Sequence, residues 1–336
     1  MTRLAINGFG RIGRAAFKIA LEHADEAEVV AINDLGDINN LAYLLKYDSV
    51  YGRYNRTVEV SGKDLVVDGK TVKVFAEKDP SKLPWGDLQV DVVIESTGVF
   101  TEADKARLHL QGGAKKVIIS APTKSNELKT VVLGVNDDDM SGQEIISNAS
   151  CTTNCVSPVM AILENAFGVE KGLMTTAHAM TATQSLVDGP ATKDFRRGRA
   201  ANANIVPSTT GAAEAVIRTM PKLDGKFDGI SLRVPVIVVS IADFSVLLKK
   251  KVSVEEVNKA FEDAAAHPLY QGVVAVTRDP VVSSDFIGDP HSAIVDLELT
   301  RVVDGDFVKV MAWYDNEWGY SNRLVEQAIA LAAHNG

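Results

Sequence analysis

Cysteine is almost absent from this sequence: among 336 residues, only Cys151 and Cys155 are cysteines. Two cysteines four positions apart are no disulfide framework, and on one helix they could not bridge without local unwinding. Aromatic residues make up only 6% of the chain, and no apolar run approaches the roughly 20 residues of a membrane span. The opening stretch MTRLAINGFG contains no signal-peptide apolar region. We therefore expect a cytoplasmic protein that does not enter a membrane.

An excess of positive charge is also missing. The formal net charge is −9, which argues against general binding to nucleic acid or to anionic membranes. With 46% hydrophobic and 24% charged residues, the composition is that of a globular protein long enough for two domains. One basic cluster stands out locally, and it is either a solvated loop or a site for a small anion. Its members are Lys193, Arg196, Arg197 and Arg199.

The first motif present lies near the N-terminus. An apolar strand runs into Gly8-x-Gly10-x-x-Gly13 and then into a helix-like stretch, and a second apolar run ends at Asp34. This order is typical of a dinucleotide site, in which the glycines allow a tight turn, close approach to a pyrophosphate and close helix packing. Asp34 would hold the adenosine ribose and repel a 2′-phosphate, which favours NAD over NADP. The alternative is that Asp34 is the N-cap of a helix starting near residue 38.

The rest of the first half alternates apolar runs with helical stretches, which predicts a mostly parallel sheet. The runs expected as strands are 90–94, 116–119 and 131–135. Ligands bind beyond the carboxyl ends of such strands, where Ser96, Thr97 and Ser120 lie. These three are cofactor contacts or ordinary turn residues. Short runs between residues 46 and 73 predict an antiparallel excursion.

The midpoint of the chain carries both cysteines, in Ser150-Cys151-Thr152-Thr153-Asn154-Cys155. A strand-like run precedes this stretch and a helix-like run, 156–167, follows it. Cys151 is therefore expected near a helix N-terminus, where N–H groups and the helix dipole favour a thiolate, the form that attacks carbonyls. The alternative is that both cysteines are small buried hydrophobic residues.

One histidine has unusual surroundings. Among six histidines, only His178 lies among four threonines at the end of an apolar run. A histidine near Cys151 could share the thiol proton, although a structural histidine is the alternative. The other five have ordinary surroundings: His23, His109, His267, His291 and His334.

The second half also offers groups that could bind anions. The stretch Ser208-Thr209-Thr210-Gly211 at an expected helix start is an anion cradle, an N-cap, or both. Arg233 lies within a strand-like run, 230–248, and needs an anionic partner if it is buried. Together with the run 293–303, it predicts a large antiparallel or mixed sheet covered by a helix at 254–266.

Taken together, these stretches closely resemble the phosphorylating glyceraldehyde-3-phosphate dehydrogenase family over essentially the whole chain. The motifs are INGFGRIGR, NASCTTNC, HAMTATQ, RRGRAA, PSTTGAA and WYDNEWGYSN. The resemblance implies an NAD-binding Rossmann domain with a doubly wound parallel sheet (1–150) and an α+β catalytic domain with a large mixed or antiparallel sheet (151–315). It also implies a C-terminal helix, 316–336, that packs back on the first domain, and a homotetramer.

The resemblance further implies the roles of particular residues. Cys151 would be the nucleophile and His178 its proton-transfer partner, without a metal. The residues implied to contact NAD are Gly8, Gly10, Arg11, Ile12, Gly13, Asp34, Lys78, Ser96, Thr97, Ser120, Asn316 and Tyr320. Those implied to bind the substrate phosphate are Thr181, Thr183, Arg197 and Arg233. Those implied to bind the attacking inorganic phosphate are Ser150, Thr152, Thr210 and Gly211.

The implied reaction converts glyceraldehyde 3-phosphate and inorganic phosphate into 1,3-bisphosphoglycerate, through a thiohemiacetal and a thioester on Cys151. The sequence departs from the family at Met180, where Tyr or Thr is common, and at Val236-Ile237-Val238, where Thr-Pro-Asn is usual. These departures affect the expected loop shape and substrate affinity rather than the reaction class. The alternatives are an erythrose-4-phosphate dehydrogenase and a dinucleotide-binding redox sensor in which Cys151 is oxidised rather than catalytic.

Overall fold

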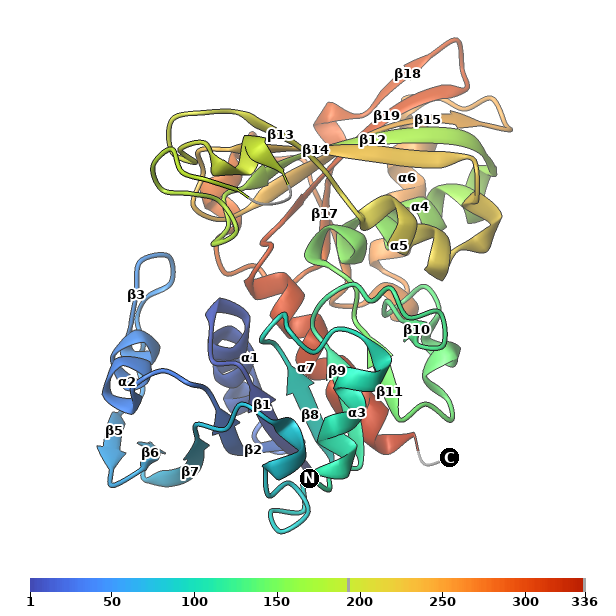
Figure 1. The fold of residues 1–336 in the computed structure, drawn as a ribbon. Coiled ribbons are helices and arrows are strands. Elements are labelled where there is room, and N and C mark those ends of the chain that lie inside the picture. The colour runs from blue at the N-terminus through green and yellow to red at the C-terminus, as the bar shows by residue number, and fades with distance from the viewer. Residues whose placement is uncertain (192–193, 335–336) are drawn as a thin grey trace. The chain divides into compact units, whose positions relative to one another are not determined.

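The computed structural model describes residues 1–191 and 194–334 and divides into two compact units (Figure 1). Unit 1 comprises Met1–Val131, Asp137–Ala149 and Ser321–Gly336, and unit 2 comprises Val132–Asn136 and Ser150–Tyr320. Lys193 of the basic cluster, and the last two residues of the expected C-terminal helix, lie outside the described residues. The cysteine stretch begins where the chain enters unit 2.

Unit 1 is built on one twisted sheet whose neighbouring strands are parallel from β10 to β7 and antiparallel from β7 to β5. In sheet order the strands are β10 (Lys129–Thr130), β11 (Ile145–Ser147), β9 (Lys116–Ile119), β8 (Val92–Glu95), β1 (Thr2–Asn7), β2 (Ala27–Asn33), β7 (Lys70–Phe75), β6 (Asp64–Val67) and β5 (Val58–Ser61). The helices are α1 (Arg11–Glu22), α2 (Ile38–Lys46) and α3 (Ala103–Gln111), and a small hairpin joins β3 (Tyr47–Asp48) to β4 (Gly52–Arg53). The predicted parallel sheet and antiparallel excursion are confirmed.

The structure excludes one alternative for Asp34 and contradicts one predicted strand. Asp34 does not cap α2, because Asp37 is the N-cap and its Oδ1 accepts hydrogen bonds from the N–H groups of Asn39 (2.9 Å) and Asn40 (3.2 Å). The expected strand 131–135 is also absent from the described fold. There the Asn136 side chain accepts the Val132 N–H at 2.9 Å and Gly134 has φ +81°, so an apolar run forms a turn.

Unit 2 is built on a mixed sheet covered on one face by helices. In sheet order its strands are β13 (Val206–Thr209), β14 (Phe227–Val234), β12 (Val169–Ala179), β15 (Ser240–Leu248), β19 (Phe307–Tyr314), β17 (Ala293–Asp296) and β16 (Val274–Thr277), with β18 (Arg301–Val303) beside β19. The helices are α4 (Cys151–Phe167), α5 (Ala212–Thr219) and α6 (Val254–Ala265), while α7 (Trp318–Ala333) begins in unit 2 and continues in unit 1. The run 293–303 is two strands rather than one, because a 3₁₀ turn, Leu297–Leu299, interrupts it.

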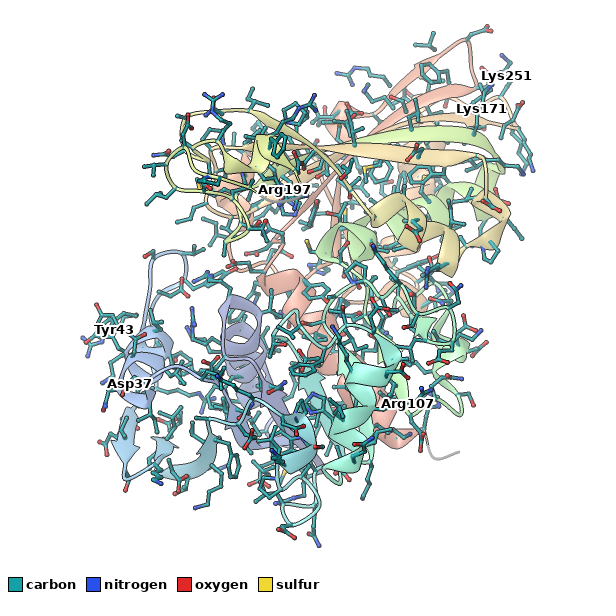
Figure 2. The ribbon with its side chains drawn as sticks, viewed as in Figure 1. Asp37, Tyr43, Arg107, Lys171, Arg197 and Lys251 are labelled. Atoms are coloured by element: carbon teal, nitrogen blue, oxygen red, sulfur yellow. The ribbon has the colours of Figure 1, made fainter. Side chains whose placement is uncertain are left out.

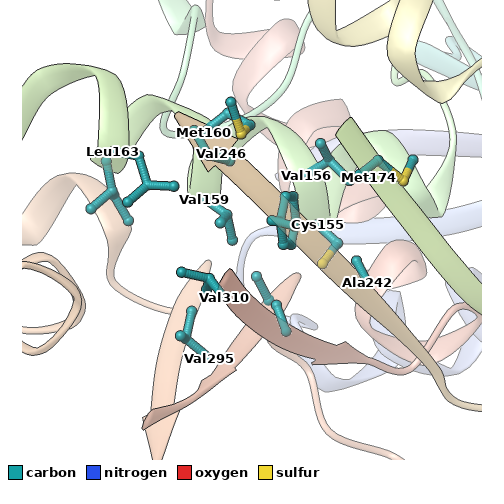
Figure 3. Close-up of a cluster of buried hydrophobic side chains, with 14 of the residues drawn as sticks. Cys155, Val156, Val159, Met160, Leu163, Met174, Ala242, Val246, Val295 and Val310 are labelled. Carbon is teal, nitrogen blue, oxygen red and sulfur yellow. The ribbon is translucent and has the colours of Figure 1, made fainter. Parts of the chain in front are cut away.

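The core of unit 2 holds α4 in place (Figure 3). One face of α4, with Cys155, Val159 and Leu163, packs against strand residues that include Met174 and Val310. Each such fully buried aliphatic side chain contributes about 1.5–3 kcal/mol. Cys155 is completely buried, so the interpretation as a small hydrophobic residue is confirmed for this cysteine. This packing fixes where the helix begins, at Cys151.

Candidate active site

Cys151 is the first residue of α4, as the sequence predicts. Ser150 is the N-cap, and its Oγ accepts the N–H of Thr153 at 3.1 Å. Ala149, directly before this cap, has φ +54°, a left-handed conformation that costs energy for a residue other than glycine. The turn therefore accepts local strain to start the helix at the thiol. Both cysteines are free thiols, and Cys151 is partly exposed whereas Cys155 is buried.

The structure brings His178 and Arg233 to Cys151. The Sγ of Cys151 lies 3.4 Å from Nε2 of His178, which is only 3% exposed. His178 and Arg233 are opposite each other in the parallel pair of β12 and β14. Nη1 of Arg233 lies 2.6 Å from Nδ1 of His178 and 3.1 Å from the carbonyl oxygen of Ala179. The neighbouring strands thus place a base and a cation beside the thiol.

The contacts of His178 define two exclusive arrangements of its ring proton. A guanidinium can only donate, so when Arg233 donates to Nδ1 the ring proton lies on Nε2 and faces Cys151. Nδ1 is also 2.7 Å from the carbonyl oxygen of Ala179. If Nδ1 carries the proton and donates to that oxygen, the Nε2 lone pair faces the thiol and Arg233 must point elsewhere. The position of Arg233 therefore decides which nitrogen can act as a base.

Burial acts on the pKa values of this pocket in addition to the helix N-terminus. Burial raises the pKa of the Cys151 thiol, although the charge of Arg233 and hydrogen bonds from Thr152 oppose this shift. Burial, followed by the charge of Arg233, lowers the pKa of His178 to about 3. Burial thus opposes the stabilisation of a thiolate by Arg233 and Thr152, and it favours the neutral form of the His178 imidazole.

Tyr314 supports the same pair and was missed by the sequence prediction. Its hydroxyl lies 3.1 Å from Oγ1 of Thr152 and 2.9 Å from Oγ1 of Thr176. Its ring is edge-on to His178, with centroids 6.1 Å apart. The sequence could only suggest that the aromatic residues near position 314 meet a cofactor ring or pack. The structure shows that Tyr314 ties the first turn of α4 to the strand that carries His178.

Ser240 orients Asn316, a connection that no sequence motif indicated. Oγ of Ser240 accepts the N–H of Ala179 at 3.0 Å and donates to Oδ1 of Asn316 at 3.0 Å. The amide oxygen of Asn316 is thereby turned toward Ser240, which directs its Nδ2 donors to the other side. The Asp315 carboxylate accepts the N–H groups of Gly288, Glu317 and Trp318. Tyr320 lies in the same unit and is buried.

The predicted phosphate ligands form a second group in unit 2. Thr183 and Arg197 line a cavity of about 520 Å³, and Oγ1 of Thr181 lies 2.9 Å from Oγ1 of Thr183. Arg197, labelled in Figure 2, contacts the carbonyl oxygen of Thr209 at 3.4 Å. In the basic cluster, Arg199 pairs with Asp188 at 2.9 Å.

Thr210 and Gly211 lie at the start of α5. Gly211 is the N-cap position, and Oγ1 of Thr210 accepts the N–H of Ala212 at 3.1 Å. The contacts found among the described residues join Cys151 to His178 and onward to Arg233, but they do not join it to Thr210 or Gly211.

The two departures from the family pattern lie side by side. The N–H of Met180 donates to the carbonyl oxygen of Val236 at 3.0 Å. Ile237 is 52% exposed, whereas Val238 and Val239 are buried. Val239 has φ +69°, which is a strained backbone for a β-branched residue. The segment that follows Arg233 is therefore tied to the segment that follows His178.

In unit 1 the glycine-rich turn borders a cavity of about 490 Å³. A Cβ on Gly10 would meet no atom within 4 Å, whereas a Cβ on Gly13 would lie 2.0 Å from the Gly8 carbonyl oxygen. Gly10 thus leaves open space above the loop and Gly13 permits close packing, which fits a dinucleotide pyrophosphate at the start of α1. Other predicted cofactor residues on the cavity wall are Asp34, Lys78, Ser96 and Thr97.

Several of these side chains also hold the protein together. The Asp34 carboxylate accepts the N–H groups of Phe9 (2.7 Å) and Gly36 (2.8 Å), and Ser96 Oγ donates to the Gly8 carbonyl oxygen at 2.7 Å. Arg11 forms an ion pair with Asp48 at 2.6 Å. Ile12 lies in the first turn of α1, and Ser120 directly follows β9.

The described part of the chain contains neither a metal-binding cluster nor a membrane-spanning helix. Residues 1–191 and 194–334 contain no group of three or more His, Cys, Asp or Glu side chains arranged to hold a metal ion. Within the same residues, no helix combines the length and the apolar character required to cross a bilayer.

Comparison with known proteins assigns a family to both parts of the chain. Residues 2–103 match the family model "Glyceraldehyde 3-phosphate dehydrogenase, NAD binding domain", and residues 150–316 match "Glyceraldehyde 3-phosphate dehydrogenase, C-terminal domain". The chain belongs to the glyceraldehyde-3-phosphate dehydrogenase family. The first match includes the glycine-rich turn and Asp34, and the second includes Cys151 and His178.

Named relatives match over nearly the whole length. Glyceraldehyde-3-phosphate dehydrogenase 2 of Streptomyces avermitilis is 53% identical over 329 residues, which cover 97% of each chain. Glyceraldehyde-3-phosphate dehydrogenase 1 of Kluyveromyces lactis is 52% identical over 327 residues, 97% of this chain and 98% of the relative. The family resemblance inferred from the motifs is confirmed.

Proposed function

We propose that this protein oxidises glyceraldehyde 3-phosphate with NAD and inorganic phosphate to give 1,3-bisphosphoglycerate. The observation that carries the proposal is the Cys151 thiol at the start of α4, 3.4 Å from Nε2 of His178. This geometry suits a nucleophile and a general base acting on an aldehyde. The two family matches and the relatives' names support the substrate and the cofactor.

The reaction begins with Cys151 and His178 as neutral partners. The thiol transfers its proton to Nε2 of His178 as Sγ forms a bond to the carbonyl carbon. The imidazolium then gives this proton to the carbonyl oxygen, which becomes the hydroxyl of a thiohemiacetal. His178 is neutral again and lies beside the new hydroxyl, so it can accept a second proton.

Oxidation converts the thiohemiacetal into a thioester. His178 takes the hydroxyl proton while the carbon loses its hydrogen together with both bonding electrons. NAD supplies the acceptor for that hydride when it is bound. Inorganic phosphate next bonds to the thioester carbon and the carbon–sulfur bond breaks, releasing the acyl phosphate. The Cys151 thiolate takes the proton back from His178, which restores the starting pair.

Arg233 would couple anion binding to the state of the base. In the arrangement described above, Arg233 donates to Nδ1 of His178, which leaves the ring proton on Nε2. The phosphate of the substrate, bound with Thr181, Thr183 and Arg197, would attract Arg233. Nδ1 can then carry the proton and donate to the carbonyl oxygen of Ala179, so that Nε2 becomes the base.

Each unit by itself carries residues that we assign to the cofactor. In unit 1 we assign the pyrophosphate to the glycine-rich turn with Arg11 and Ile12, and the adenosine ribose to Asp34. Lys78, Ser96, Thr97 and Ser120 complete this set. In unit 2 we assign the nicotinamide to Asn316 and Tyr320. The inorganic phosphate is assigned to Ser150, Thr152, Thr210 and Gly211, whose N–H and hydroxyl groups lie at helix starts.

An absorbance assay of NADH formation tests the proposed reaction. We expect turnover with glyceraldehyde 3-phosphate that depends on added phosphate and is faster with NAD than with NADP. Turnover without phosphate dependence would contradict the phosphorylating reaction. Faster turnover of erythrose 4-phosphate would instead assign the protein to that substrate.

Removal of the thiol separates catalysis from cofactor binding. Cys151→Ser should lower turnover by about 10⁴-fold or more, because a hydroxyl is a far weaker nucleophile, while the affinity for NAD is retained. Cys155→Ala is the matched control and should keep its activity. Substantial turnover in Cys151→Ser would end the assignment of the nucleophile and favour a redox-sensing role for this cysteine.

We also propose that the protein is a cytoplasmic homotetramer. Two free thiols suit a reducing compartment. Self-association is supported by exposed apolar side chains on the strands of the unit 2 sheet: Leu173, 64% exposed; Ile230, 53% exposed; and Phe307, 48% exposed. A second copy of this face is the expected partner, since like faces pair across a twofold axis.

A further inference from the structure

His109 has ordinary surroundings in the sequence, yet the structure buries it completely beside a carboxylate. Nε2 of His109 lies 3.0 Å from Oε2 of Glu95, and both side chains are 0% exposed. On the other side of the ring, Nε1 of Trp85 lies 3.1 Å from Nδ1. An indole N–H can only donate, so Nδ1 accepts and the ring proton lies on Nε2. His109 therefore donates to Glu95.

The hydrogen bonds continue from Glu95 across the sheet in a single direction. Nδ2 of Asn7 donates to Oε2 of Glu95 at 2.5 Å, and Nδ2 of Asn33 donates to Oδ1 of Asn7 at 2.7 Å. Asn33 in turn bonds both backbone groups of Glu77, accepting its N–H at 2.8 Å and donating to its carbonyl at 2.9 Å. Because these backbone groups have fixed roles, the orientation of every amide in the chain is set.

This network lies at the edge of the sheet where the cofactor cavity opens. Asn7, Asn33 and Glu95 are opposite one another in register at the carboxyl ends of β1, β2 and β8. Glu95 Oε1 accepts the N–H of Thr97 at 2.9 Å and also its hydroxyl. Asn7, Asn33, Glu77 and Thr97 line the cavity, whereas Glu95 and His109 lie behind that wall.

We propose that Glu95 and His109 are positioning residues for NAD. His109 orients the Glu95 carboxylate, and Glu95 fixes Thr97 and Asn7 on the wall of the dinucleotide cavity. This proposal rests on the proposed function only for the identity of the cofactor. Its physical basis is that every donor in the network faces an acceptor, so an isosteric change that replaces an acceptor by a donor displaces the cavity wall.

Glu95→Gln keeps the shape of the side chain and replaces one acceptor oxygen by a donor. An NH₂ in place of Oε2 would face the donors of Asn7 and His109, and an NH₂ in place of Oε1 would face those of Thr97. We expect the Kd for NAD, measured by titration calorimetry well below the unfolding temperature, to rise about tenfold or more. At saturating NAD, kcat should change by less than about threefold, since the wall acts on binding.

Two substitutions of His109 separate hydrogen bonding from packing. His109→Gln can accept from Trp85 and donate to Glu95, so its Kd for NAD should stay within about threefold of the parent protein. His109→Leu fills similar space without polar atoms and should bind NAD as weakly as Glu95→Gln. Arg107→Leu, on the exposed face of the same helix (Figure 2), is the control and should bind NAD normally.

An unchanged Kd in folded Glu95→Gln or His109→Leu would overturn the proposal, as would equally weak binding by His109→Gln and His109→Leu. If His109→Leu fails to fold, the comparison of Glu95→Gln with His109→Gln decides. The titration needs no turnover, so it is independent of the aldehyde assay. A parent protein that binds NAD without oxidising the aldehyde would refute the proposed function alone.

Discussion

Cys151 and Cys155 are one helical turn apart and have opposite environments. Cys155 is completely buried among apolar side chains, and burial raises the pKa of its thiol well above the ordinary value. Cys151 is partly exposed and has His178 and Arg233 nearby. Only Cys151 combines access for a substrate with a base, so the residue type alone does not define the nucleophile.

The charge of Arg233 should be visible in the pH dependence of Cys151 alkylation. A nearby cation favours the thiolate and lowers the thiol pKa, opposing the effect of burial. Arg233→Gln should therefore shift the alkylation rate profile with iodoacetamide to higher pH, and lower the rate at any fixed pH below the midpoint. Arg199→Gln, whose side chain pairs with Asp188, is the control. A profile that does not move, or that moves to lower pH, would contradict this effect.

Ser240 should matter for cofactor binding although it lies behind Asn316. Ser240→Ala removes the donor to Oδ1 of Asn316 and the acceptor for the N–H of Ala179. We expect the KM for NAD to rise about tenfold, equivalent to about 1.4 kcal/mol, with little change in the KM for the aldehyde. Steady-state kinetics with each substrate varied in turn measures this, and Ser245→Ala on the same strand is the control. An equal rise in both KM values would indicate general damage instead.

At the scale of elements, the glycine-rich turn needs glycine for two different reasons: close packing at Gly13 and access for the cofactor at Gly10. Gly13 must lack a side chain because the Gly8 carbonyl oxygen lies against it, whereas Gly10 faces open space. Gly13→Ala should therefore lower the unfolding temperature as well as the NAD affinity. Gly10→Ala should keep the unfolding temperature within about 2 °C, since added surface methyl groups cost little, and weaken NAD binding by blocking the approach of the pyrophosphate. Thermal unfolding and NAD titration of both variants provide the test, and equal destabilisation would argue against the distinction.

In unit 2, helix and strand packing fixes the position of the Cys151 thiol. The buried face of α4 anchors the helix, Ser150 caps it, and Tyr314 joins its first turn to β12. The parallel pairing of β12 with β14 then brings Arg233 beside His178. The positions of nucleophile, base and cation thus follow from one helix start and one strand register.

At the scale of the whole molecule, the prediction concerns assembly. Leu173→Lys places a charge on the exposed strand face that we assign to self-association, and desolvating that charge in an interface is costly. Sedimentation should show a shift from tetramers to smaller species with the fold retained by circular dichroism. Arg107→Glu, on the outside of α3, should leave the tetramer intact. A Leu173→Lys variant with unchanged mass would refute this interface.

Much of the architecture could be predicted because its signals are local. The spacing of Gly8, Gly10 and Gly13 indicates a strand, a turn and a helix, and the apolar runs indicate a parallel sheet. The predicted strand at 131–135 was wrong because the Asn136 side chain accepts the Val132 N–H and stabilises a turn in this apolar run. The alternative role of Asp34 as a helix cap is excluded, because Asp37 caps the helix three residues later.

By itself, the sequence determined the family, the dinucleotide turn and the position of Cys151 at a helix start, since each depends on neighbouring residues. Only the tertiary structure decided what that cysteine meets. The contacts of Cys151 with His178, of Glu95 with Asn7 and of Ser240 with Asn316 join residues far apart in the chain. They depend on strand order and register, which bring distant residues together. The raised pKa of the Cys151 thiol and the lowered pKa of His178 likewise depend on burial, which only folding creates.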